Sequence, residues 1–149
     1  MAQAKSLKFG KQIMLLGDGE TPTEGFEAPC GFESLTLTVN IETNETNLPD
    51  CDDPDLPAWL VSDEVSKQMV IGGEGVLDTD AYQVWREWLL EGGERNVRWL
   101  SDAAPGDGGG YFEAPGILSA YEESGQRGQR WQVSITVNLN GKPEWTAFT

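Results

Sequence analysis

The sequence contains no histidine, only two cysteines, and far fewer basic than acidic side chains. Histidine is the commonest general base, and no serine, cysteine or lysine lies in a recognisable nucleophile motif. A glycosidase needs only two carboxylates, but an abundance of acids defines no geometry between them. The formal net charge of −15 argues against a protein that grips nucleic acid, because such proteins neutralise phosphates with lysine and arginine. We therefore expect no enzyme and no cofactor.

Long apolar runs are also missing. The longest, Ile13 to Leu16, is far shorter than the roughly 20 residues of a membrane span. The first residues, Met-Ala-Gln-Ala-Lys-Ser-Leu-Lys, lack the apolar stretch of a signal peptide. We expect a protein that is made in a cytosol and has no membrane contact, in which Cys30 and Cys51 are free thiols rather than a secreted disulfide framework.

What the sequence does contain is alternation. In the segment 33–42, Leu35, Leu37, Val39 and Ile41 point one way, while small polar side chains point the other. The segment 130–140 repeats this pattern, with Trp131, Val133, Ile135, Val137 and Leu139 on its apolar face. The polar positions are Thr36, Thr38 and Asn40 in the first strand, and Gln132, Ser134, Thr136 and Asn138 in the second. Such a face is either an ordinary solvated side of an antiparallel sheet or a lining past which something slides.

The remaining segments predict a single, mainly β domain spanning residues 1–149, an antiparallel β-sandwich or barrel with one amphipathic helix. We expect further strands at 7–16, 25–29, 61–71, 96–100 and 111–122, and a bulge or tight bend at 72–75. Strands 33–41 and 131–139 carry little that would blunt a free edge. The helix, about 80–91, has an N-cap at Asp80, a stop at Gly92-Gly93, and a buried stripe of Ala81, Val84, Trp85, Trp88 and Leu89.

Three segments are expected outside this core. The N-terminal arm, 1–11, is basic and could either dock on the acidic body of a neighbouring copy or be disordered. The long loop, 43–59, holds three prolines and a run of carboxylates, which predict no regular structure. Its aspartates offer oxygen ligands for calcium, yet they lack the glycine and glutamate of an EF-hand loop, so a solvated acidic loop is the alternative. The C-terminal extension, 141–149, is expected to leave the sheet, with Trp145 and Phe148 either docking elsewhere or clipping onto their own domain.

The order of these parts resembles the major tail tube proteins of long-tailed bacteriophages with non-contractile tails. The resemblance rests on Gly25-Phe-Glu-Ala-Pro-Cys-Gly-Phe32, Leu35-Thr-Leu-Thr-Val-Asn40, the long loop, Gly72-Gly-Glu-Gly-Val-Leu77, Trp85-Arg-Glu-Trp-Leu-Leu-Glu-Gly92 and Asn140-Gly-Lys-Pro-Glu-Trp145. It spans nearly the whole chain. It implies a β-sandwich subunit of a virion tail, made in the host bacterial cytoplasm, whose hexameric rings stack into a tube that conducts DNA during genome ejection. It also implies contacts with tape measure, tail terminator and baseplate proteins, and no catalytic residues.

On this interpretation the polar faces line an acidic lumen, and the arm and long loop join stacked rings. The residues assigned to the lumen are Thr36, Thr38, Asn40, Glu42, Ser134, Thr136 and Asn138. Those assigned to contacts between rings are Lys5, Lys8, Lys11, Glu45, Asp50, Asp52, Asp53 and Asp55, and those assigned to C-terminal docking are Trp145 and Phe148. DNA would pass without specific binding.

Two other functions fit the same composition. Six tryptophans, acidic loops and a β-sandwich also describe a carbohydrate-binding module, in which exposed aromatic rings stack on sugars. A minor tail subunit or a head–tail joining subunit of related fold is the second. Polymerisation separates the tube protein from the carbohydrate-binding module, which would stay small and bind a glycan.

Overall fold

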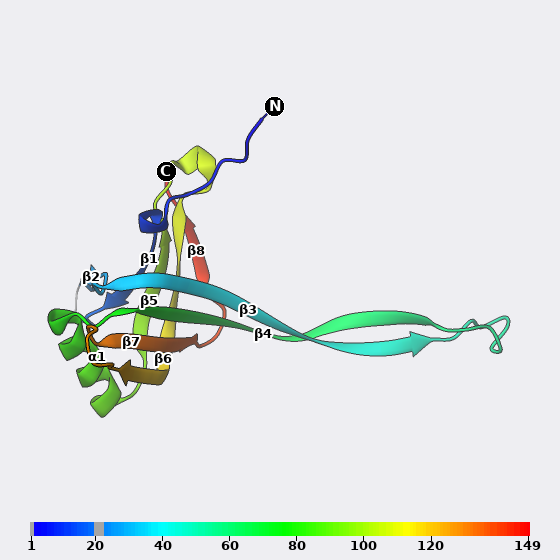
Figure 1. Cartoon of the computed structure of the whole chain (residues 1–149). Coiled ribbons are helices and arrows are strands. Elements are labelled where there is room, and N and C mark those ends of the chain that lie inside the picture. Colours follow the sequence, from blue (N-terminus) through cyan, green and yellow to red (C-terminus); the bar gives the residue numbers. More distant parts are fainter. Residues whose placement is uncertain (1, 20–22) are drawn as a thin grey trace.

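The computed structural model, which describes residues 2–19 and 23–149, is an antiparallel sheet folded into two layers with one helix against it (Figure 1). The strand order is β2-β1-β5-β6-β7-β4-β3, and β8 pairs with β6. The strands are β1 (Gln12–Gly17), β2 (Phe26–Glu27), β3 (Phe32–Leu48), β4 (Trp59–Val76), β5 (Arg95–Ser101), β6 (Gly110–Ser124), β7 (Gln132–Leu139) and β8 (Glu144–Ala147). The helices are α1 (Thr79–Glu91) and the short 3-10 turns η1 (Phe9–Lys11) and η2 (Pro105–Asp107).

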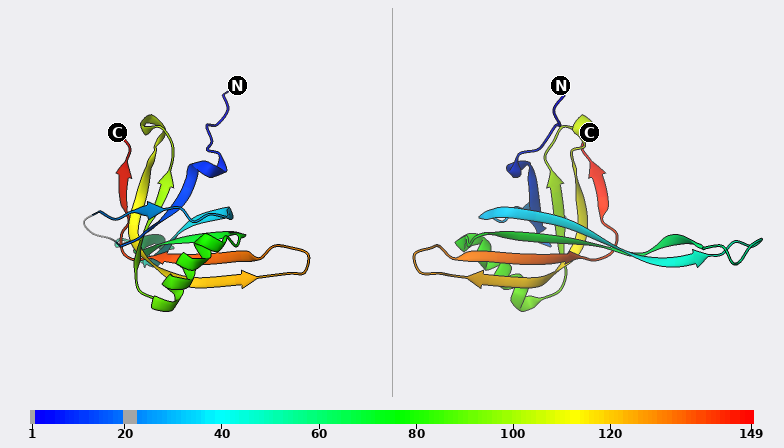
Figure 2. Two further views of the ribbon diagram at one scale, coloured as in Figure 1. Left: turned by 90° about the vertical axis from the view of Figure 1, so that its left-hand side faces the viewer. Right: turned by 45° about the vertical axis from the view of Figure 1, so that its right-hand side comes forward.

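Strand β6 joins the two layers, because its two halves pair with different partners. Residues 110–116 pair with β5, and residues 110–113 also pair with β8. Residues 116–124 pair with β7, with a register irregularity between Leu118 and Ala120. One layer therefore holds β1, β5, β8 and the first half of β6, and the other holds β3, β4, β7 and the second half, running across the first (Figure 2). The predicted mainly β, sandwich-like fold is confirmed.

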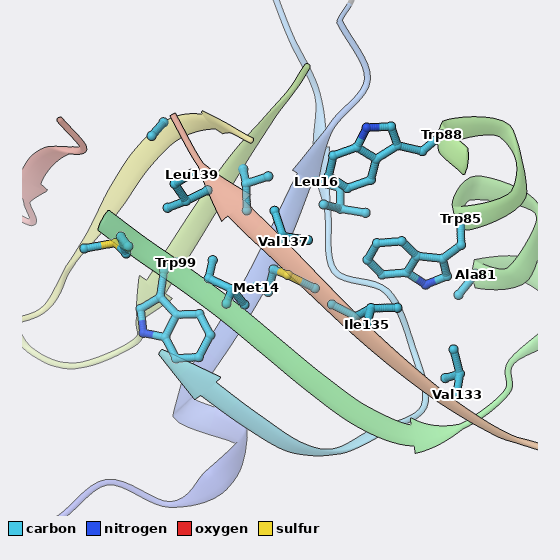
Figure 3. Close-up of a cluster of buried hydrophobic side chains, with 14 residues drawn as sticks. Met14, Leu16, Ala81, Trp85, Trp88, Trp99, Val133, Ile135, Val137 and Leu139 are labelled. Atoms are coloured by element: carbon cyan, nitrogen blue, oxygen red, sulfur yellow. The ribbon is translucent and has the colours of Figure 1, made fainter. Parts of the chain in front are cut away.

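The core lies between these layers and under α1 (Figure 3). The apolar positions of β7, from Val133 to Leu139, are all buried, as the alternation predicts. They meet Met14 and Leu16 of β1, and Trp85 of α1, which is 1% exposed and stacks on Trp88. Val39 and Ile41, assigned to the same apolar face, are about half exposed because their part of β3 runs beyond the other layer. Trp131 is also exposed, since it precedes β7.

Helix α1 confirms the predicted segment, but its first turn is capped differently. The side chain of Asp78, not Asp80, accepts a hydrogen bond from the backbone N–H of Ala81, at 3.0 Å. At the other end, Gly92 adopts φ of 70°, a conformation that favours glycine. Leu89 was wrongly assigned to the buried stripe and is 53% exposed, because it lies at the flank of the helix face on which Ala81, Trp85 and Trp88 are buried. No helix among residues 2–19 and 23–149 has the length and apolar character needed to cross a lipid bilayer.

The predicted long loop at 43–59 is wrong for residues 43–48 and for Trp59, which belong to strands. Strands β3 and β4 continue past the sheet as a two-stranded ribbon, paired from Thr43 opposite Glu64 to Leu48 opposite Trp59. A register irregularity after Glu42 lets the ribbon twist away from the body (Figure 1). Only residues 49–58, called the tip below, lie outside strands. The prediction failed because all three prolines of this segment fall in the tip, so nothing prevents 43–48 from pairing.

The glycine-rich segment 72–75 stays within β4, so the predicted bulge lies on the partner strand. Phe32 pairs with Gly75 and Ser34 with Glu74, which leaves Glu33 as the extra residue. A Cβ atom at Gly75 would lie 2.2 Å from the backbone oxygen of Gly31, so only glycine fits this crossing. Position 73 is also tight, because the ring of Phe32 lies over it.

The cap of α1 gives a direct test of this geometry. We expect Asp78→Ala to lower the free energy of unfolding by about 1 kcal/mol, because an N–H of the first turn loses its partner. Asp78→Asn should retain most of the stability. The control Asp80→Ala should cost less, since Asp80 contributes only through the helix dipole. Chemical denaturation measures all three, and an equal loss for Asp78→Ala and Asp80→Ala would contradict the assigned cap.

Candidate functional site

The polar side chains predicted on separate strands share one face of the layer formed by β3, β4, β7 and the second half of β6. Thr36 pairs with Gly72, and Gly72 pairs in turn with Thr136. Thr38 pairs with Val70, which pairs with Asn138. Directly opposed residues of an antiparallel sheet point to the same side, so β4 joins the two predicted rows into one surface, here called the polar face.

The ionisable groups of the polar face are all acidic. Glu42 lies on β3, Glu74 on β4 opposite Ser134, and Glu122 on β6 opposite the same serine. Lys67 pairs with Ile41 and therefore projects from the opposite side of the sheet. Among the described residues, no lysine or arginine occupies a paired position of this face. These positions are Ser34, Thr36, Thr38, Asn40 and Glu42 on β3; Ser66, Gln68, Val70, Gly72, Glu74 and Val76 on β4; Gln132, Ser134, Thr136 and Asn138 on β7; and Ile117, Ala120, Glu122 and Ser124 on β6. The face is neutral to negative throughout.

The centre of the polar face is hollowed. A shallow groove of about 270 Å³ runs between Thr36 and Thr136, with Gly72 and Gly73 as its floor. The hydroxyl-bearing side chains beside it are exposed on β3 and half-buried on β7. The surface therefore offers short side chains with no bulky group to obstruct it.

Two free strand edges flank the polar face. Strand β3 is the last strand on one side, and residues 117–124 of β6 pair only with β7 within the described parts of the chain. The expectation of a free edge is thus correct for 33–41 and wrong for 131–139, because β7 is paired on both sides, with β4 and β6. Sequence alternation shows which way side chains point but not where a strand sits in the order.

The N-terminal arm lies far from the tip in the same subunit (Figure 1). The Nζ atom of Lys5 is 3.5 Å from a carboxylate oxygen of Asp107, and that of Lys11 is 3.5 Å from one of Asp102. All four side chains are at least half exposed, so these pairs contribute about 0–1 kcal/mol each. Lys8 is exposed as well. A contact between arm and tip must therefore join two copies.

Two aspartates of the tip accept hydrogen bonds from backbone N–H groups of the tip itself. The carboxylate of Asp50 accepts hydrogen bonds from the N–H groups of Asp52 and Asp53, at 2.8 and 3.2 Å, and that of Asp53 accepts one from Asp55 at 3.3 Å. Glu45, grouped with them in the sequence, lies back on the ribbon opposite Ser62. In residues 2–19 and 23–149, no three histidine, cysteine or acidic side chains come together as metal ligands. Cys51 in the tip and Cys30 are exposed free thiols.

The C-terminal extension does not leave the sheet, contrary to expectation. Strand β8 pairs with the first half of β6, and the ring of Trp145 packs on Phe112 with centroids 4.7 Å apart. The N–H of Phe148 donates to the backbone oxygen of Gly109, at 2.9 Å. Of the two alternatives for these aromatic residues, the structure has the clip onto their own domain. The prediction failed because four residues after a Gly-Lys-Pro turn give too short a pattern to reveal a strand.

Two further surface features have no counterpart among the predicted site residues. The first is a groove of about 610 Å³ between residues 26–30 and α1, with an apolar floor that includes Phe26 and Val84. The second is the turn between β6 and β7, Gly125 to Trp131, which carries two arginines and no carboxylate. On the core side of β6, burial and a hydrogen bond from the hydroxyl to a carboxylate oxygen of Glu123 raise the pKa of Tyr121 above its usual value.

Both the sequence and the fold of the chain resemble those of known proteins. The sequence profile of the family described as phage tail tube protein matches residues 8–145. The chain belongs to the phage tail tube protein family. Its role is that of a structural tail tube protein, and the polar face is the candidate site of that role. No individually characterised protein sequence matches the chain.

Solved structures of tails share the fold. A subunit from the tail of an empty gene transfer agent particle, refined with C6 symmetry, superimposes with a TM-score of 0.77 at 17% identity, covering 95% of this chain and 100% of that one. A subunit of the SPP1 tail tube superimposes with a TM-score of 0.68 at 11% identity, covering 96% and 80%. At such low identities the likeness concerns the fold alone.

The glycines of β4 allow a matched test of the polar face. A Cβ atom at Gly72 meets no atom closer than 4.0 Å, whereas one at Gly75 meets backbone at 2.2 Å. We expect Gly72→Ala to leave the free energy of unfolding unchanged or raise it by up to about 1 kcal/mol, because alanine restricts the unfolded chain. Gly75→Ala should lower it by about 1–3 kcal/mol through overpacking. Thermal denaturation decides, and equal tolerance at the two positions would contradict the described crossing of β3 and β4.

Proposed function

We propose that this tail tube protein forms the wall of a non-contractile phage tail, in which hexameric rings stack into a conduit for DNA. The observation that carries the proposal is the polar face, a four-stranded surface without cations, flanked by two free edges. The similar gene transfer agent tail has C6 symmetry, which supports a ring of six. The protein would be made in the host bacterial cytoplasm and act in the virion.

The free edges supply the ring contact. When the edge of β3 in one copy pairs with residues 117–124 of β6 in the next, the backbone N–H and C=O groups on both strands gain partners. Such a contact is heterologous, since two different surfaces meet, and rotation closes it into a ring. Each copy then adds its four strands to one continuous sheet, with the polar face on a single side.

That side would be the lumen, lined by the polar residues of β3 and β7 together with Glu42. Carboxylates repel phosphate, and hydroxyl and amide groups supply no positive charge to hold it. DNA would therefore pass without specific binding. The tube would also contact tape measure, tail terminator and baseplate proteins.

Stacking would use the surfaces that project from the body. The lysines of the arm, Lys5, Lys8 and Lys11, would meet carboxylates of the ribbon, such as Glu45, on a neighbouring copy, because the arm and the ribbon lie at separate places in one subunit. The carboxylates of the tip would also contact the adjacent ring. Single exposed ion pairs contribute about 0–1 kcal/mol, but six copies repeat each of them around a ring. The C-terminal clip keeps Trp145 and Phe148 on the body, where their half-exposed rings can still contact a neighbour.

The competing carbohydrate-binding function fits the tryptophans poorly. Trp85, Trp88 and Trp99 are buried in the core. The exposed tryptophans, Trp59, Trp131 and Trp145, lie beside the tip, in the β6–β7 turn and on β8, so they form no common platform for a sugar. The family and the scarcity of catalytic groups in the sequence also support a protein that is not an enzyme.

Assembly of the purified protein tests the proposal. We expect rings or hollow tubes in electron microscopy and a matching rise in sedimentation coefficient. Deleting residues 2–8 should weaken stacking while changing the free energy of unfolding by less than about 1 kcal/mol, because the pairs it removes are exposed. The deletion stops before Lys11, whose backbone oxygen accepts the N–H of Asp102.

Salt provides the control for this experiment. Stacking should decline between about 0.1 and 1 M salt, where the screening length falls from about 10 to 3 Å. A protein that stays monomeric under all these conditions would refute the tube. Rings that never lengthen would instead favour a terminator or joining subunit, and a truncated protein that stacks like the full chain would remove the arm from the mechanism.

The lumen assignment is tested by adding charge. We expect Thr38→Lys with Thr136→Lys to preserve folding, because these positions are exposed and half-buried, and to slow DNA release from assembled particles by adding phosphate contacts in every copy. The slowing should be strongest at low salt. The matched control is Thr79→Lys with Gln83→Lys, which adds the same two charges at exposed positions of α1, the helix that packs on the core side of the sheet. An unchanged release rate at low salt for the lumen variant would show that the polar face points elsewhere.

A further inference from the structure

We propose that the tip of one subunit docks on the basic β6–β7 turn, residues 125–131, of a subunit in the adjacent ring. This inference rests on the proposed function, since it specifies the stacking contact of the tube. It identifies the partner of the ribbon as a second copy of this chain and places the contact at a turn that the family assignment leaves without a role.

The ribbon exposes apolar side chains that a free subunit would bury poorly. Trp59 is 85% exposed and Leu60 56%, and Leu48 opposite Trp59 is exposed too. From Met69 toward the tip, β4 pairs only with β3, so this part of the hairpin has two strands and no second layer against it (Figure 1). An isolated two-stranded hairpin is at best marginally stable in water, so this part of the chain needs a partner surface.

The partner must accept negative charge. Residues 49–58 contain four aspartates and no basic residue. The large groove beside α1 is a poor acceptor, because its rim includes Asp78, Asp80 and Glu87. The β6–β7 turn has the opposite composition, Gly-Gln-Arg-Gly-Gln-Arg-Trp, with Arg127 and Arg130 exposed and Trp131 58% exposed over Gly125. It presents two guanidinium groups beside an indole, which suits a segment of carboxylates beside Trp59 and Leu60.

Strand register forbids this contact within one subunit. Gln132 at the start of β7 pairs with Val76, the last residue of β4, whereas Trp59 begins β4 at the tip. The 18 residues of β4 separate the two surfaces by about 55 Å at about 3.3 Å per residue. The tip and the turn therefore project from opposite ends of the same sheet, as the right-hand view of Figure 2 shows.

This placement has the symmetry that stacking requires. An acidic, apolar projection at one end of the sheet and a basic, aromatic projection at the other form a head-to-tail pair, and repetition of such a pair generates an open filament. Translation of a copy along its own strands brings its turn toward the tip of the copy behind. The polar face is left clear, because both projections lie at the ends of the strands that form it.

Crosslinking through Cys51, an exposed thiol in the tip, tests the contact directly. In a Cys30→Ser background, Gln126→Cys and, separately, Gln129→Cys place a second thiol in the turn. Assembled protein is treated with a short bismaleimide and run on a denaturing gel. We expect a ladder of linked subunits, at least about tenfold stronger than for the control Lys142→Cys, because thiols held at one interface reach an effective concentration of about 1 mM. Dissociated protein should give no ladder.

Charge reversal gives a second readout that does not depend on the new thiols. Arg127→Glu with Arg130→Glu, and separately Asp52→Lys with Asp53→Lys, should each raise the protein concentration needed for stacking by at least about tenfold, and the combined variant should recover most of the loss. The matched control, Arg86→Glu with Lys142→Glu, reverses two charges at exposed positions outside the tip and the turn and should have little effect.

The outcomes separate this inference from the proposed function. If the Cys30→Ser protein forms no rings or tubes, the proposed function fails. If it forms tubes in which Lys8→Cys links to Cys51 while Gln126→Cys and Gln129→Cys do not, the tip meets the arm and the inference is overturned. The inference is also overturned if tubes form but none of these thiols is crosslinked to Cys51, and the combined charge-reversal variant does not recover stacking.

Discussion

The structure depends most on the unpaired backbone groups along the outer edges of β3 and β6. A sheet edge in water is satisfied by solvent, but it is also a template for another strand. Here one edge belongs to the longest hairpin of the fold and the other to the strand that joins the two layers. Blunting either edge would require charge or proline on strands whose alternate positions already serve the core. The layer that carries the polar face thus keeps two free edges, and a ring is an arrangement that removes both.

Sequence reasoning recovered what depends on periodicity and missed what depends on pairing. Alternation in 132–139 correctly identified the buried side chains, and the stripe around Trp85 did so except at Leu89, because burial depends mainly on which way a side chain points. The position of β7 inside the sheet, the extension of β3 to Leu48 and the return of β8 to β6 depend on long-range hydrogen bonds, which leave no period in the sequence. The candidate polar face was found because two of its strands alternate strongly, and the contribution of Gly72 and Glu74 emerged only from register.

The core between the two layers stabilises the subunit, whereas the segments that project from the core are available for assembly. Tryptophans, methionines and branched residues fill the space between layers and beneath α1, so the subunit has a core of its own. The ribbon, the arm and the β6–β7 turn lie outside that core and contribute little to it. Elements with few buried contacts open at low free energy and adapt readily to a partner. Substitutions in the projections should therefore alter assembly without unfolding the subunit, which makes the stacking contacts open to experiment.

Charge segregation explains how so acidic a protein can polymerise. Copies that each carry a formal charge of −15 repel one another, but this repulsion acts over many ångströms and is largely screened once the Debye length falls to about 10 Å at 0.1 M salt. Ion pairs in contact survive that screening and weaken only at higher salt. Half of the ten lysines and arginines lie on the arm and the β6–β7 turn, and in the described part of the chain none lies at a paired position of the polar face. Attraction is therefore local where copies meet, and the polar face keeps its negative charge. The same acidity that keeps phosphate moving through a tube is thus compatible with the contacts that build it.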